Sequence, residues 1–239
     1  MKPNQISPLP SFAYGILYGA IALTPFYSEG DDAIWKSDAE VASVIIPYVD
    51  ANYDRIVKEQ ERKLGITFSS VPQYSFDAHP TSEANAHYDP ETGAITFHTA
   101  GAFDTDGLAR VMTILEITRR EFRQELEGTI RHELAHDYFF ERAEAFGMKT
   151  YWNEYSIDLD GHPEHRSIVK HQIAEGVAEY MSGRKRNDHK ETYELVEPIL
   201  SLDYKRGIDA IVQNPPLSSE WTDLRLYKQR IRAIVQRSQ

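Results

Sequence analysis

The chain has 239 residues, 41% of them hydrophobic and 26% charged, so it can bury the core of one sizeable domain. Its formal net charge of -11 argues against nucleic acid and anionic membrane as partners, because an acidic surface repels both. It contains no cysteine, which excludes disulfide bonds, thiolate catalysis and cysteine-ligated structural zinc. Any metal ion must therefore be held by histidine and carboxylate side chains.

An apolar stretch at 12–27 (FAYGILYGAIALTPFY) sets the N-terminal segment, 1–36, apart from the rest of the chain. The stretch is short for a membrane span. It resembles the apolar region of a secretory signal, but only Lys2 precedes it as a positive charge and no clear small-x-small cleavage site follows. Two interpretations stay open. The segment is a signal or pro-segment of an exported or membrane-associated protein, or it is a buried first helix or strand of a cytoplasmic one. Membrane contact is expected through 12–27 alone.

The remaining residues, 37–239, are predicted to form one domain that begins with a long helix. Ser37 and Glu40 form a capping-box pattern, and Gly65 is expected to end the helix. Pro47 predicts a kink or a restart within it. The apolar residues that recur at helical spacing are Val41, Ile45, Ile46, Val49, Tyr53, Ile56 and Val57.

The strands are predicted to follow this helix directly. Residues 66–68 are predicted to form a short strand, and the polar stretch 71–86 is predicted to be a loop. Residues 89–93 (DPETG) have turn chemistry. Apolar and polar residues alternate over 94–99, which predicts a strand with one covered face.

The rest of the chain is predicted to be mainly helical. It is expected to stay helical from 107 to about 147, to continue through a connector at 148–165, and to form another helix over 164–182 that Gly183 caps. Prolines break the last helical part at 214–216. This order predicts an α+β fold, in which a small antiparallel or mixed sheet precedes a mainly helical C-terminal part. The inward-facing residues of the 164–182 helix are Ile168, Val169, Ile173, Val177 and Met181.

One predicted helix carries an H-E-x-x-H pattern, within 129–138 (TIRHELAHDY). His132 and His136 stand four residues apart, so they share one face and can reach one zinc ion at about 2.0–2.1 Å. Glu133 lies beside the first ligand, where its carboxylate can take a proton from activated water without binding the metal. The alternative is an amphipathic surface helix whose histidines face solvent.

A catalytic zinc ion that keeps an open position needs a third protein ligand. The extended metzincin pattern is excluded, because Phe139 and Arg142 occupy its glycine and histidine positions. Glu175, in the segment IAEGVAEYMSG, is the candidate, and Gly176 after it allows two helices to approach closely near the ion. Glu179 lies one turn further on the same face, where it could accept a hydrogen bond from the outer nitrogen of a ligand histidine.

The other histidines divide into two groups. His162, His165 and His171 precede Glu175 and are kept as substitute ligands, although such residues are more often solvated. The remaining four have no ligand spacing: His79, His87, His98 and His189.

These two segments together resemble the gluzincin metallopeptidases, the zinc peptidases with a glutamate ligand that include thermolysin and a family of aminopeptidases. The resemblance rests on H-E-x-x-H at 132–136 and E-G-x-A at 175–178, with a longer gap between them than in those enzymes. It covers mainly 87–207. It implies a zincin-like fold, one zinc ion held by His132, His136 and Glu175, and hydrolysis of a peptide or protein substrate. The G-x-M-E-N signature of the aminopeptidases is absent, so an endopeptidase is expected.

The resemblance implies two further features. Residues 204–207 (YKRG) are similar to a Y-x-K-G-like motif, with arginine in place of lysine, so Tyr204 would stabilise the oxyanion. The alternative for Tyr204 is a packed surface aromatic. The family also binds extended substrates along an edge strand that precedes the active-site helix. The strand at 94–98 is predicted to be that edge strand, above the helix.

The predicted function is therefore zinc-dependent peptide hydrolysis. One alternative is a catalytically inactive zinc-binding module with a structural or interaction role. Glu133 argues against it, because a purely structural site needs no carboxylate at that position. A zinc hydrolase that acts on another kind of bond is the third possibility.

Overall fold

The fold was obtained as a computed structural model that describes residues 34–78, 85–101, 107–153, 164–184, 190–220 and 223–237, with the backbone alone for 164–168. The predicted apolar segment 12–27 and residues 154–163 of the predicted connector lie outside this part. Within it, no helix is long and apolar enough to cross a membrane.

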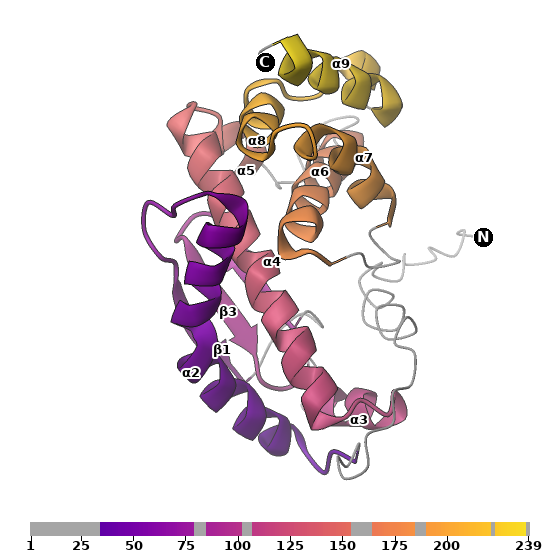
Figure 1. The fold of residues 1–239 in the computed structure, drawn as a ribbon. Coiled ribbons are helices and arrows are strands. Elements are labelled where there is room, and N and C mark those ends of the chain that lie inside the picture. Colours follow the sequence, from indigo (N-terminus) through magenta and orange to yellow (C-terminus); the bar gives the residue numbers. More distant parts are fainter. Residues whose placement is uncertain are drawn as a thin grey trace, which may run out of the picture.

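The described chain is mainly helical and contains one small sheet, so the predicted α+β class is confirmed. A long central helix, α4, has the sheet and α2 towards one end and the C-terminal helices towards the other (Figure 1). In chain order the elements are α2 (Asp38–Leu64), β1 (Gln73–Asp77), β2 (Ala86–Asp89), β3 (Ala94–His98), α3 (Gly107–Ile114), α4 (Arg119–Ala145), α5 (Lys149–Asn153), α6 (Glu164–Ser182), α7 (Lys190–Leu200), α8 (Tyr204–Gln213), the 3-10 helix η1 (Ser218–Glu220) and α9 (Leu224–Arg237).

The helix α2 begins and ends where the sequence predicts. The Ser37 hydroxyl accepts a hydrogen bond from the Glu40 N–H, and Gly65 ends the helix in the left-handed conformation with a φ of 64°. The Glu40 carboxylate does not complete the box on Ser37: it accepts from the Lys36 N–H at 2.8 Å. Pro47 lies inside one continuous helix, so the predicted restart is wrong.

In the described part, three strands form one mixed sheet in the order β1-β3-β2. β3 pairs in parallel with β1 and antiparallel with β2. The predicted edge strand, Ala94–His98, is therefore the central strand, and its backbone groups on both sides are taken by neighbours. β2 is an edge strand, and the face of the sheet to which its Tyr88 belongs packs against α4, where the Tyr88 ring stacks on Phe140.

Two other strand predictions are wrong. Residues 66–68 form no strand: the Phe68 N–H donates to the Glu61 carboxylate, and the neighbouring Ser69 N–H donates to Glu141. β1 lies within the stretch predicted as a loop, 71–86, because its polar residues alternate with aromatic ones that face the helices.

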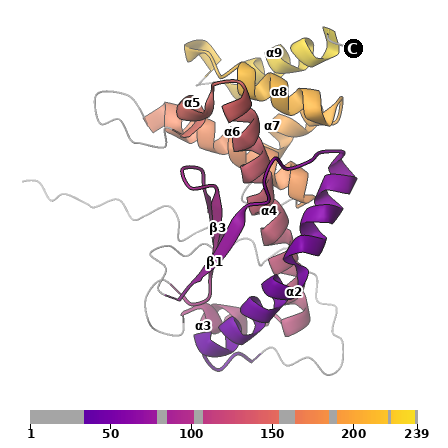
Figure 2. The ribbon, with the colours of Figure 1, turned by 90° about the vertical axis from the view of Figure 1, so that its left-hand side faces the viewer.

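The two faces of the sheet differ in chemistry because side chains alternate along each strand. One face packs against α2 and α4, which lie to one side of the sheet (Figure 2): Tyr74 contacts Tyr53 of α2, and Tyr88 contacts Phe140 of α4. Its residues are Tyr74, Phe76, Ala86, Tyr88, Ile95 and Phe97. The opposite face carries polar residues: Ser75, Asp77, His87, Thr96 and His98.

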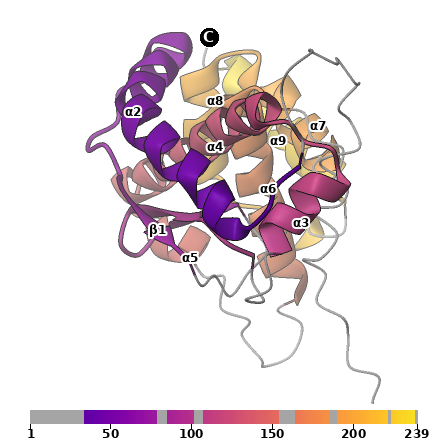
Figure 3. The ribbon, with the colours of Figure 1, turned by 90° about the horizontal axis from the view of Figure 1, so that it is seen from below.

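The predicted helical stretch 107–147 is divided into α3 and α4. The chain turns at Glu116, which has a φ of 52°, and Thr118 then caps α4 through a full capping box with Glu121. The predicted helix over 164–182 is confirmed as α6, and its Val169, Ile173, Val177 and Met181 are buried. Seen from below, α6 lies behind α4 on the side away from α2 (Figure 3).

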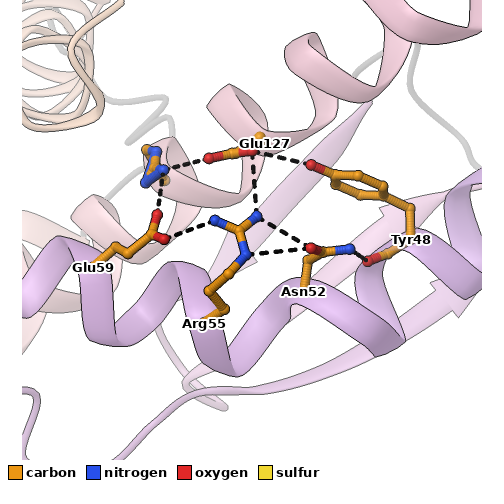
Figure 4. Close-up of polar contacts among 6 residues, drawn as sticks. Tyr48, Asn52, Arg55, Glu59 and Glu127 are labelled. Carbon is orange, nitrogen blue, oxygen red and sulfur yellow. Dashed lines mark hydrogen bonds and ion pairs between the residues drawn. The ribbon is translucent and has the colours of Figure 1, made fainter.

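A polar network fixes α2 along the middle of α4 (Figure 4). Arg131 of α4 bonds Glu127 on its own helix and Glu59 of α2, the latter at 3.0 Å. Arg55 of α2 reaches the same two carboxylates, at 2.8 Å from Glu59 and 3.4 Å from Glu127. Such partly exposed ion pairs contribute about 0–1 kcal/mol each to stability, so their main effect is to fix the position of α2 along α4. This position matters because Arg131, which makes the contact with α2, directly precedes His132.

Candidate metal centre

The helix α4 presents His132 and His136 on successive turns of its buried face. The two Nε2 atoms lie 3.1 Å apart, and the residues are only 8% and 7% exposed. Leu134 and Ala135 between them are fully buried, as expected for residues that pack beneath a site. The alternative of a surface helix with solvent-facing histidines is therefore wrong.

Glu175 reaches the two imidazoles from α6, which packs along α4. Its Oε2 lies 3.2 Å from the His132 Nε2, and its Oε1 lies 3.3 Å from the His136 Nε2. Ligand atoms of the three residues all lie within 4.8 Å of one another. A tetrahedral zinc ion with arms of about 2.0–2.1 Å separates its ligands by about 3.3–3.4 Å. The three side chains thus fit a metal ion of this size and could hold one.

The carboxylates and imidazoles of this cluster shift one another's pKa values. Burial acts to lower the pKa of His132, but the carboxylates of Glu175 and Glu179 outweigh it and the pKa is raised. Burial likewise acts to raise the pKa of Glu175, but the neighbouring charge of His136 and hydrogen bonds from both histidines keep it well below its usual range. A metal ion must therefore compete with a proton for these ligands.

Two further predicted residues flank this cluster. Glu133 is 6% exposed, and its side chain makes no hydrogen bond or ion pair with any residue that the structure describes. Its carboxylate helps to raise the pKa of the adjacent His132. Glu179 is fully buried on α6, with its Oε1 3.4 Å from the His132 Nδ1. This contact is on the predicted outer nitrogen, at a distance that is long for a hydrogen bond.

Gly176 permits a close approach of helices, but not the predicted one near the ion. A Cβ atom added at Gly176 would lie 2.4 Å from the carbonyl oxygen of Thr192, which belongs to α7. Glu175 and Gly176 are neighbours on α6 and point about 100° apart around it. The glutamate therefore faces α4, while the glycine faces α7.

Tyr204 starts α8, and its hydroxyl makes no hydrogen bond with His132, His136 or Glu175. Its ring stacks on Tyr180 with centroids 6.2 Å apart, and its hydroxyl is buried without a hydrogen bond to any described residue. Burial, with Tyr138 and Tyr180 nearby, raises the pKa of this hydroxyl well above its usual value. Tyr138 follows His136 by two residues, so it points to the other side of α4. The oxyanion role of Tyr204 stays a prediction.

Among the substitute ligands, the structure describes the side chain of His171 alone. His171 lies one turn before Glu175 on α6, and its Nδ1 is 3.8 Å from the Glu175 Oε1. Its ring is 44% exposed, so it stands on the solvent side of the cluster. His162 lies outside the described residues, as does the side chain of His165.

Asp137 is a buried residue of the site region that sequence reasoning missed. It follows His136 directly and is 5% exposed. Burial and the charge of Glu141 raise its pKa to about 7, although the nearby Tyr88 hydroxyl acts in the opposite direction. In the sequence it is typical of the polar side of an amphipathic helix. The packing of β2 against α4 brings Tyr88 close to it.

Sequence reasoning also assigned no ligand spacing to His87 and His98, yet the sheet brings them together.

Comparison of the chain with family models, with curated proteins and with solved structures finds no match.

Proposed function

We propose that the chain is a zinc-dependent hydrolase of peptide bonds with a zincin-like catalytic core, acting as an endopeptidase. One observation carries the proposal: His132, His136 and Glu175 converge from two helices with ligand atoms within 4.8 Å of one another, and Glu133 stands beside them. Two imidazoles and a carboxylate are the donor set of catalytic zinc in this kind of hydrolase.

Each residue then has a distinct task. When bound, zinc would supply a Lewis acid that activates water and polarises the scissile carbonyl. His132, His136 and Glu175 hold it, and Glu179 orients the His132 ring from behind. Glu133 accepts the proton of the attacking water and delivers it to the leaving amine. Its side chain has no partner among the described residues that would occupy the carboxylate.

The same features favour catalysis over an inactive zinc-binding module. Structural zinc sites normally close all four positions with protein ligands. The described part of the chain brings three ligands together here, and a carboxylate without another task stands next to them. That is the composition of a site with one position open for water.

A peptide substrate is supported by the edge of the sheet. β2 pairs with β3 on one side and has no strand on its other side in the described part. It also contacts α4, the helix that carries both histidines. An extended peptide could add to this edge through main-chain hydrogen bonds. β2 then has the substrate-binding role predicted for 94–98.

The test combines metal content with activity. Elemental analysis of the purified protein should find zinc in the wild type and in Glu133→Gln, and less in Glu175→Ala. Glu191→Ala, which changes an exposed glutamate of α7, is the matched control and should behave as wild type. On a mixture of unstructured peptides, Glu133→Gln should lose about 10²–10⁴-fold in rate. Full activity in Glu133→Gln would refute the mechanism, and zinc retained by Glu175→Ala would move the third ligand elsewhere.

A further inference from the structure

The polar face of the sheet, which points away from α2 and α4, carries a second pair of histidines. His87 of β2 lies opposite Thr96 of β3, and His98 follows Thr96 by two residues on the same face. The His87 Nδ1 lies 3.0 Å from the His98 Nε2, and the two rings are stacked with centroids 5.1 Å apart. Strand pairing thus brings together two residues that are eleven positions apart in the chain.

The distance between these nitrogens is close to that in the candidate metal centre. The His132 and His136 nitrogens lie 3.1 Å apart, and the His87 and His98 nitrogens lie 3.0 Å apart. Two imidazoles on one ion of zinc size are separated by about 3 Å or slightly more, depending on the angle at the metal. An ion between the His87 and His98 nitrogens would therefore require little movement of either ring.

The second nitrogen of His98 faces a carboxylate, beyond hydrogen-bond distance. Histidines that bind metals usually turn their other ring nitrogen towards a carboxylate or carbonyl oxygen. The His98 Nδ1 lies 3.9 Å from the Asp77 Oδ2, and it is buried with no hydrogen bond to a described residue. Asp77 lies directly opposite His98 in the β1–β3 pairing. Across the sheet, the Asp77 carboxylate is thus followed by the buried imidazole of His98 and then by the exposed imidazole of His87.

The protonation of the pair favours metal binding. His98 is 3% exposed, and burial together with the nearby charge of His87 lowers the pKa of its ring, while Asp77 acts in the opposite direction. A ring that stays neutral keeps a lone pair for a metal ion. His87 is exposed, so one side of the pair faces solvent.

We propose that the His87 Nδ1 and the His98 Nε2 form a second metal site, with Asp77 behind His98, for a divalent transition-metal ion that prefers imidazole. Zinc, nickel and copper belong to this class, whereas magnesium and calcium require oxygen ligands. Two protein ligands leave the remaining positions to solvent, so the ion is held more weakly than at the first centre and exchanges. The inference does not depend on the proposed function.

Zinc titration against a chromophoric chelator tests the site, with four variants of the full chain. The wild type should take up two zinc ions. His87→Asn and Glu175→Ala should each take up one, and the double variant none. Thr96→Val is the matched control, because it changes the same face of the sheet and leaves both imidazoles in place. It should bind like the wild type.

Two results would overturn the second site. One is an unchanged stoichiometry in His87→Asn, which would leave the pair as an ordinary hydrogen bond. The other is the loss of one zinc ion in Thr96→Val as well, which would show that the effect comes from disturbed strand pairing rather than from the imidazoles. If Glu175→Ala keeps all its zinc while His87→Asn loses one, Glu175 is not the third ligand of the first centre and the second site stands. Since His87 is exposed, its variant should fold, and the imidazole NMR signal of His98 in the wild type should shift on zinc addition as an independent readout.

Discussion

Glu179 of α6 lies with its Oε1 3.4 Å from the Nδ1 of His132, while Glu175 meets the Nε2 of the same ring at 3.2 Å. The imidazole is therefore enclosed by two carboxylates from one helix, one turn apart. Glu179 is fully buried. The first carboxylate shares the ligand cluster, and we predict that the second orients the ring.

Glu179→Gln should weaken zinc binding without abolishing it. Loss of a carboxylate behind a ligand histidine typically lowers metal affinity by about 10–100-fold. The zinc affinity of Glu179→Gln, measured by chelator competition, should thus fall by that factor. The zinc affinity of Glu175→Ala should fall much further. Glu191→Ala serves again as the control. Equal affinities of Glu179→Gln and the wild type would show that Glu179 does not orient the ring.

Gly176→Ala should destabilise the protein through the contact between α6 and α7. The new Cβ would meet the carbonyl oxygen of Thr192 at 2.4 Å, so one helix must shift. Such overpacking costs about 1–3 kcal/mol in the free energy of unfolding, which urea denaturation measures.

The matched control for this prediction is Gly107→Ala, at the start of α3. There the added Cβ would have its nearest neighbour at 3.6 Å, an ordinary contact. Its free energy of unfolding should change by less than about 1 kcal/mol. Equal stability of the two variants would mean that α6 and α7 adjust without cost.

Asp137→Asn should change how stability depends on pH. The folded carboxyl has a pKa of about 7 against an ordinary value of 3.8, so between these values the folded state holds a proton that the unfolded state has released. Its contribution to stability is complete below about pH 4 and is lost as the pH rises through about 7. Asparagine has no proton to lose, so the stability of Asp137→Asn relative to the wild type should increase from about pH 4 to about pH 8.

Urea denaturation across that pH range measures the difference. Asp54→Asn, which changes an exposed carboxylate of α2, is the control and should show a nearly constant difference from the wild type. A constant difference for Asp137→Asn as well would show that its carboxyl titrates normally in the folded protein.

Tyr204→Phe separates the two roles that the sequence left open. The hydroxyl is buried without a partner among the described residues, so its removal should leave the free energy of unfolding unchanged or slightly increased. Zinc content should also stay the same. If the hydroxyl binds the oxyanion, the rate of peptide hydrolysis falls by about 10²–10³-fold. An unchanged rate would leave Tyr204 as a packing residue beside Tyr180.

The sequence by itself determined the parts of this protein that depend on the geometry of single helices. The spacing of His132 and His136, and of Glu175 and Glu179, places each pair on one helical face, because backbone hydrogen bonds set the rotation per residue whatever surrounds the helix. The four side chains that meet between α4 and α6 could therefore be named in advance, and so could the ends of α2 at Ser37 and Gly65.

The tertiary structure alone decided which elements become neighbours. Strand order made 94–98 central and left β2 at the edge, and it brought His87 to His98 although their spacing in the chain predicts no contact. Gly176 approaches α7 and not α4 for the same reason. Such pairings depend on the packing of residues far apart in the chain, and local spacing along one element carries no information about them.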